Sequence, residues 1–177
     1  RVQSHHVSSV REISVRPVIV PSDRLEELTS HLMLFYTGIK RTADKVAGSY
    51  VPSLEAKRRQ LRILRDMVEE ALSILCGHGP IKEYGKLLHE GWLAKQAISD
   101  KISNATITEL YDAARSAGAI GGKLLGAGGG GFMLLFVEPD KQAAVQEKFK
   151  DLIQVSFGID NAGSKIVVYE PDGLENR

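Results

Sequence analysis

The sequence lacks the features that mark several common protein classes. Cys76 is the only cysteine in 177 residues, which excludes an intrachain disulfide and a cysteine-based metal cluster. The longest apolar run, Phe132–Val137, is far shorter than the roughly 20 residues that a membrane-spanning helix needs. The first residues show no charged-then-apolar signal pattern. We therefore expect a cytoplasmic protein.

Excess charge of either sign is also missing. Lysine and arginine together number 23, aspartate and glutamate 22, and the formal net charge is +1. Such a balance gives no long-range attraction to nucleic acid or to an anionic membrane, so we expect neither as a partner. An anion bound by this protein must be held locally, by a few groups.

The composition allows a packed core, because 43% of the residues are hydrophobic. The length suits one domain. We expect residues 1–177 to form a single domain, with residues 1–12 as a disordered lead or a remnant of cloning. The neighbouring His5 and His6 suggest the second of these.

Helical and extended patterns alternate along the chain and predict an α+β layered domain. A Thr-x-x-Glu capping box at Thr106–Glu109 predicts a helix that continues to about Ala117. The spacing of apolar residues predicts further helices over residues 22–30, 61–76 and 81–98 and from 139 through Ile153. Strands are predicted over residues 13–20, 31–36, 132–137 and 166–169.

The most unusual segment is the glycine-rich run Gly121–Gly131, which reads Gly-Gly-Lys-Leu-Leu-Gly-Ala-Gly-Gly-Gly-Gly. Glycine adopts positive φ at little cost and lets backbone N–H groups approach an oxyanion closely. Lys123 would add a positive charge. We interpret the run as a loop that binds a phosphate group.

Two common phosphate loops are excluded by the sequence around this run. A Walker loop needs Gly-Lys-Ser/Thr, whereas Phe132 follows Gly131 here. A dinucleotide-binding loop follows a strand and opens a helix, whereas the pattern here predicts a helix before the glycines and a strand after them. A flexible helix-to-strand connection without a ligand remains the alternative.

The segment Lys123–Phe132 resembles the third motif of the galactokinase, homoserine kinase, mevalonate kinase and phosphomevalonate kinase superfamily, the GHMP kinases. The similarity covers the chain from about Ile13 and is greatest to the sugar-kinase branch that includes the D-glycero-D-manno-heptose 7-phosphate kinases. The other segments that carry it are Phe35–Arg41, Leu88–Lys95, Ile102–Asn104, Ser116–Gly122 and Asp160–Ile166.

The resemblance implies a ferredoxin-like α+β sandwich with additional helices, the C-terminal domain of a two-domain kinase. ATP, with Mg²⁺, and a sugar phosphate would bind between the domains, and the γ-phosphoryl group would pass to an anomeric hydroxyl, giving a precursor of lipopolysaccharide. The resemblance also allows a homodimer. The residues expected at the nucleotide are Lys123, Gly126, Ala127, Gly128, Gly129, Gly130 and Gly131, and those expected at the substrate, after a strand end, are Thr37, Gly38 and Arg41.

The family's second motif, a Pro-x-x-x-Gly-Leu-Gly-Ser-Ser loop, is absent from this sequence, as is the usual acidic base. We therefore assign no catalytic residue and no metal ligand, and we expect the chain to be inactive without an N-terminal kinase domain as its partner. A non-enzymatic domain that binds a small metabolite or mediates assembly is the alternative. Of the remaining residues, we expect packing roles for Trp92 and Cys76 and a solvated or structural role for Lys95.

Overall fold

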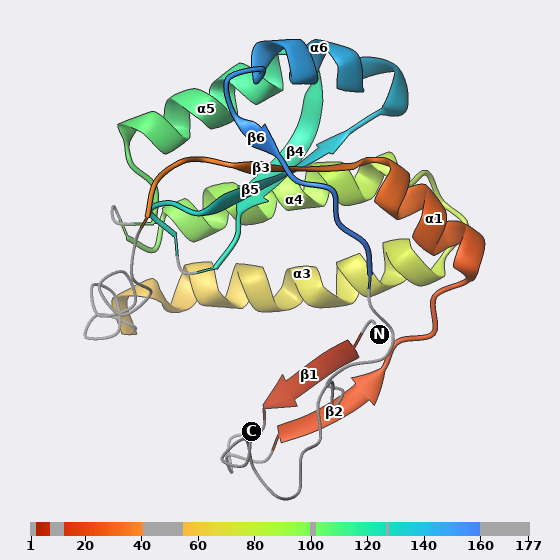
Figure 1. The fold of residues 1–177 in the computed structure, drawn as a ribbon. Helices are drawn as coiled ribbons and strands as arrows, with labels where there is room; N and C mark the ends of the chain where they lie inside the picture. The colour runs from red at the N-terminus through yellow and green to blue at the C-terminus, as the bar shows by residue number, and fades with distance from the viewer. Residues whose placement is uncertain (1–2, 8–12, 41–54, 100–101, 127, 160–177) are drawn as a thin grey trace, which may run out of the picture. The chain divides into compact units, whose positions relative to one another are not determined.

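The computed structural model describes residues 3–7, 13–40, 55–99, 102–126 and 128–159. The chain divides into two compact units, one of residues 1–19 with 158–177 and one of residues 20–157. In the first, β1 (Gln3–Val7) pairs antiparallel with β2 (Ile13–Pro17) (Figure 1). This hairpin occupies part of the expected disordered lead. β2 ends earlier than predicted, at Pro17, which lacks an N–H group for the sheet.

The second unit is built on a four-stranded antiparallel sheet in the order β4-β5-β3-β6. The strands are β3 (Leu32–Tyr36), β4 (Ala119–Leu124), β5 (Phe132–Val137) and β6 (Ile153–Gln154). Along the chain, helices separate β3 from β4, a loop joins β4 to β5, and a helix leads to β6. This β-α-β-β-α-β order with the first strand inside the sheet is the ferredoxin-like arrangement with added helices, so the predicted fold class is confirmed.

The helices lie on both sides of this sheet. Figure 1 shows α5 (Ala105–Ser116) and α6 (Gln142–Lys148) on one side, and α4 (Lys82–Gln96) on the other with α3 (Arg58–Cys76) outside it. The remaining helical elements are α1 (Ser22–Ser30) and the 3₁₀ turns η2 (Glu55–Lys57) and η3 (Pro139–Lys141). No helix in the described part of the chain is long and apolar enough to cross a bilayer.

Alternation along the strands divides the core in two. The larger cluster includes Met33 and Phe35 of β3, which pack with Ile107 of α5 and Val145 of α6. The smaller cluster forms around Phe136 on the opposite face of the sheet, with Leu28, Leu75 and Ile81. Trp92 is 1% exposed and belongs to the larger cluster, as expected of a packing residue. The expectation that Cys76 is a core residue is wrong, because its side chain is exposed at the end of α3.

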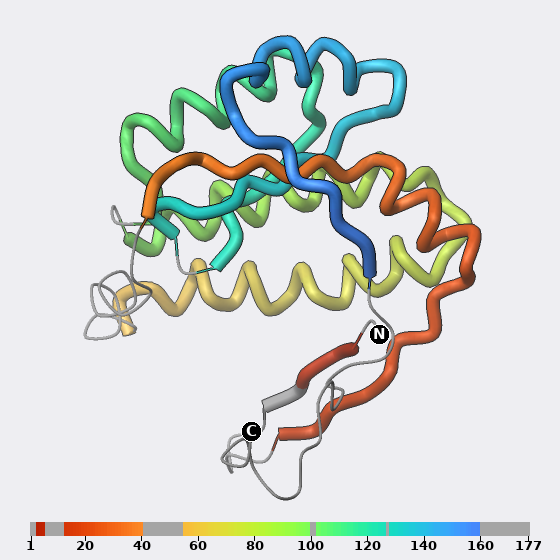
Figure 2. Tube along the Cα trace, in the orientation of Figure 1, coloured from red at the N-terminus to blue at the C-terminus, as the bar shows by residue number. Residues whose placement is uncertain are grey.

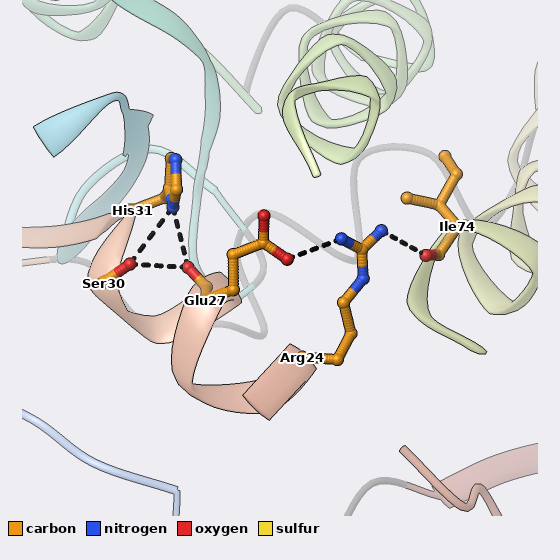
Figure 3. Close-up of polar contacts among 5 residues, drawn as sticks. All are labelled: Arg24, Glu27, Ser30, His31 and Ile74. Carbon is orange, nitrogen blue, oxygen red and sulfur yellow. Dashed lines mark hydrogen bonds and ion pairs between the residues drawn. The ribbon is translucent and has the colours of Figure 1, made fainter. Parts of the chain in front are cut away.

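Arg24 joins α1 to the end of α3 (Figure 3). Its guanidinium donates to the backbone carbonyl of Ile74 at 2.7 Å and to the Glu27 carboxylate at 2.6 Å, and the residue is only 8% exposed. The carbonyls of the last helical turn have no partner within the helix, so a buried cation there satisfies one of them and complements the helix dipole. On the other side of α1, His31 Nδ1 lies 2.7 Å from the Glu27 carbonyl oxygen.

Three local predictions need correction. The first glycines of the run, Gly121 and Gly122, lie in strand β4 rather than in a loop. The helix predicted to be capped by Thr106 begins two residues earlier and is capped by Asn104, whose side-chain oxygen accepts from the Ile107 N–H at 3.0 Å. Ile153 lies in β6 and is 64% exposed, so it is not on an inward helical face. The strand predicted over residues 166–169 lies outside the described residues.

Candidate functional site

The site begins with an unusually close contact between α4 and β4. A Cβ atom added to Gly121 would lie 1.9 Å from the backbone oxygen of Gly85, and one added to Gly85 would lie 2.5 Å from the Phe136 ring. Only glycine therefore fits at either position with this backbone. The contact aligns the helix with the strand, so that the C-terminal end of α4 reaches the loop at the end of β4. In Figure 2 these two segments meet at the end of the unit where α5 begins.

The β4–β5 loop is fixed by hydrogen bonds to two other loops. The Gly129 N–H donates to the Ile102 carbonyl at 2.8 Å, and the Gly131 N–H donates to the Ile39 carbonyl at 2.9 Å. The Gly131 carbonyl accepts from both the N–H (2.9 Å) and the hydroxyl (2.8 Å) of Thr37. The loop is thus an ordered connection between adjacent strands, held on both sides.

Glycine is required in this loop for two physical reasons. Gly126, Gly128, Gly129 and Gly131 have φ between +73° and +116°, where L side chains are strained. Gly130 has ordinary φ, but a Cβ atom on it would lie 2.5 Å from the Ile39 oxygen. Within the described residues, no acceptor is found for the N–H groups of Gly128 and Gly130. Both residues are buried, so a contact from these two N–H groups to an anion stays a prediction.

Two lysines supply positive charge beside the loop. Lys95, at the end of α4, donates from Nζ to the Gly126 carbonyl at 2.7 Å. Lys123 lies two residues after Gly121 in β4, so the alternation of the strand places it on the same face, toward α4. Burial, and then the charge of Lys123, lower the pKa of Lys95. An anion bound near both ammonium groups would offset their mutual repulsion.

Some of the predicted site residues are brought together by the structure, and others lie outside the described residues. The structure brings Thr37 and Gly38 next to the glycine loop and places Lys123 on its α4 side. Thr37 is buried and uses its hydroxyl to anchor Gly131, so a contact from it to substrate stays a prediction. Arg41 and Ala127 lie outside the described residues.

The sequence interpretation missed two side chains that contact the loop. Lys95 was expected to be solvated or structural, and the structure shows it bonded to the Gly126 carbonyl. Asn104 caps α5 and also donates to the Gly129 carbonyl at 3.2 Å. Lys95 lies three residues after the buried Trp92, so helical spacing makes the two neighbours on the surface of α4, and this pattern was the available signal.

A histidine–tyrosine pair joins α4 to α5 behind the loop. His89 Nδ1 lies 2.7 Å from the Tyr111 hydroxyl oxygen, and the rings stack with centroids 5.9 Å apart. Burial raises the pKa of Tyr111 to about 12, so the phenol is protonated at neutral pH. Burial, and then the charge of Arg115, lower the pKa of His89, with a smaller opposing effect of Glu90. We interpret this pair as a structural link, because the hydrogen bond and the ring stacking join a side chain of α4 to one of α5. The described part of the chain contains no group of His, Cys, Asp and Glu that could hold a metal ion.

The chain is similar to known proteins. Two curated relatives are kinases of sugars or sugar phosphates by name. The D-glycero-alpha-D-manno-heptose 7-phosphate kinase of Campylobacter jejuni is 27% identical over 134 residues, which cover 75% of this chain and 39% of the relative. The L-fucokinase/L-fucose-1-P guanylyltransferase of Bacteroides fragilis is 32% identical over 117 residues, which cover 64% of this chain and 12% of the relative. The chain thus spans well under half the length of either.

Solved structures show the same fold. Mevalonate kinase of L. major in complex with R-mevalonate superimposes with a TM-score of 0.66, at 18% identity, over 86% of this chain and 47% of the other. The family model described as "GHMP kinases C terminal" matches residues 67–153, which include α4, α5, β4, the glycine loop and β5. Residues 67–153 therefore belong to the GHMP kinase C-terminal family.

Proposed function

We propose that this chain is the C-terminal domain of a two-domain, ATP-dependent kinase that phosphorylates a sugar or sugar phosphate. The proposed substrate is D-glycero-D-manno-heptose 7-phosphate, and the γ-phosphoryl group of ATP would pass to its anomeric hydroxyl. The observation that carries the proposal is the anchored glycine loop, in which Lys95 bonds to the Gly126 carbonyl and, among the described residues, the Gly128 and Gly130 N–H groups have no acceptor. The names of the two sugar-kinase relatives favour this substrate class.

The loop's part in this reaction would be electrostatic. Phosphoryl transfer depends on positioning and on neutralising charge on the phosphate oxygens. Preorganised N–H groups and ammonium groups stabilise that charge without having to reorganise. Mg²⁺, when bound, would supply further positive charge to the phosphates. The described residues offer it no acidic cluster, and we assign it no ligand in this chain.

The full-length protein that contains this chain, incubated with ATP, Mg²⁺ and a panel of sugars, tests the proposal. We expect ADP release that depends on heptose 7-phosphate, and none above background from residues 1–177 alone. ATP binding without sugar-dependent ADP release from any panel member would favour the alternative, a non-enzymatic domain that binds a small phosphorylated metabolite.

A further inference from the structure

Lys95 reaches the glycine loop because of how α4 lies against β4. The Gly85–Gly121 contact fixes the two elements relative to each other. From there, ten residues of helix advance about 15 Å, and five residues of extended chain advance about 16 Å. Both paths end at the same place, where Lys95 meets Gly126. The position of α4 along β4 therefore determines that Lys95 lies next to this carbonyl.

The hydrogen bond from Lys95 is made at Gly126, where few other contacts hold the loop. Gly126 has φ +73°, and no other atom lies within 4 Å of where its Cβ would be. The later glycines are held by hydrogen bonds and close contacts to Ile39 and Ile102. Among the described residues, the Lys95 ammonium is the only side chain that bonds to the Gly126 backbone.

We propose that Lys95 is a positioning residue for the glycine loop: its ammonium holds the left-handed turn at Gly126, and together with Lys123 it provides the positive charge that selects a polyphosphate ligand. The inference rests on the proposed function, since it identifies the group that prepares the loop for the phosphates of ATP. A neutral side chain at position 95 would leave the turn unheld and Lys123 as the remaining ammonium beside it.

Calorimetric titration of the full-length protein tests this with three probes: ATP, inorganic tripolyphosphate and adenosine. We expect Lys95→Met to weaken binding of ATP and of tripolyphosphate by about tenfold, because the charge-assisted hydrogen bond that orders the turn at Gly126 is lost. Adenosine has no phosphate, so its affinity should not change. Lys95→Arg should recover most of the loss, because it keeps the charge.

Two further variants separate position from charge. Lys82→Met is the matched control, because Lys82 is an exposed lysine at the opposite end of α4, and it should bind all probes as the unsubstituted protein does. Amide spectra recorded without ligand should show shifts for Gly126 and Gly128–Gly131 in Lys95→Met. Lys123→Met should weaken polyphosphate binding, but its loop glycines should keep the amide signals that they have in the unsubstituted protein.

The possible results have distinct meanings. If the unsubstituted protein binds ATP and Lys95→Met binds it equally well, the role of Lys95 is refuted and the proposed function stands. If Lys95→Met weakens adenosine as much as ATP, the effect is general structural damage and the inference fails. If the unsubstituted protein binds neither ATP nor tripolyphosphate, both the inference and the proposed function are overturned.

Discussion

Replacing Gly130 by alanine should destabilise the fold through one identifiable collision. The added Cβ would lie 2.5 Å from the Ile39 oxygen, about 0.9 Å closer than the 3.4 Å at which ordinary contact begins. That same oxygen accepts from the Gly131 N–H at 2.9 Å. If the loop retreats by this amount, the hydrogen bond opens to about 3.8 Å and is lost.

The magnitude follows from these two effects. Overpacking costs about 1–3 kcal/mol and a lost hydrogen bond about 1 kcal/mol, so we expect Gly130→Ala to lower the free energy of unfolding by about 2–4 kcal/mol. With a urea slope of about 2 kcal/mol/M, the midpoint should fall by about 1–2 M. Urea denaturation followed by circular dichroism measures this shift.

Two other glycines provide matched controls. Gly79→Ala meets no atom within 4 Å at ordinary φ and should leave the midpoint within about 0.3 M of the original. Gly126→Ala also meets no atom but has φ +73°, so it should cost only the strain of the left-handed region, about 1–2 kcal/mol. If Gly130→Ala unfolds at the same urea concentration as Gly79→Ala, the steric account of the loop is refuted.

Three further predictions concern the rest of the domain. Arg24→Ala removes the cation that caps α3 at Ile74 and should lower the free energy of unfolding by about 1–3 kcal/mol, as measured in urea. The pKa of His89 is lowered in the folded state, so the fold binds this proton less readily than the unfolded chain does. Stability should therefore be fully present above about pH 6.5 and fall as the pH drops below it, and His89→Gln should reduce this fall in a thermal-melting series. Gly129→Val in the full-length protein should abolish turnover while the protein stays folded, because a β-branched residue cannot adopt φ +75° without strain, as judged by ADP release and circular dichroism.

Each of these has its own control. Arg65→Ala removes an arginine that is 74% exposed on α3 and should change stability by no more than about 0.5 kcal/mol; an equal effect of Arg24→Ala would contradict the capping account. A melting temperature of the His89→Gln variant that falls as steeply with acid as the original would assign the pH dependence to other groups. Full turnover in Gly129→Val would reduce the loop to a connection between strands.

The sequence predicted the helices better than the strands, for a physical reason. The limits of α1 agree with the predicted residues 22–30 because the signals for a short helix are local, although its N-cap residue is Pro21 and no side chain caps it. Strand β4 contains Gly121 and Gly122, which have low strand propensity, and its existence depends on β5 beside it and on α4 above it. β6 was missed because Ile153 continues the apolar spacing of α6, although it pairs with Tyr36.

The candidate site was located by its glycines but not fully described by them. Which N–H groups of the loop are anchored depends on the Ile39 and Ile102 carbonyls, which belong to loops distant in sequence. Every residue has a backbone carbonyl, so the residue types at these positions do not show which carbonyls accept the hydrogen bonds. The part played by Lys95 likewise depends on the spacing between a helix and a strand, which becomes measurable only once the fold is known.

The most direct test of the central claim is to follow phosphoryl transfer itself by ³¹P NMR. The full-length protein would be mixed with ATP, Mg²⁺ and D-glycero-D-manno-heptose 7-phosphate, with the Gly129→Val variant run in parallel. We predict that ADP and a new sugar phosphate signal, from a phosphate on the anomeric oxygen, appear in equal amounts. The variant should produce neither. ATP left intact by the unsubstituted protein, with this sugar and with every other sugar of the panel, would contradict the account.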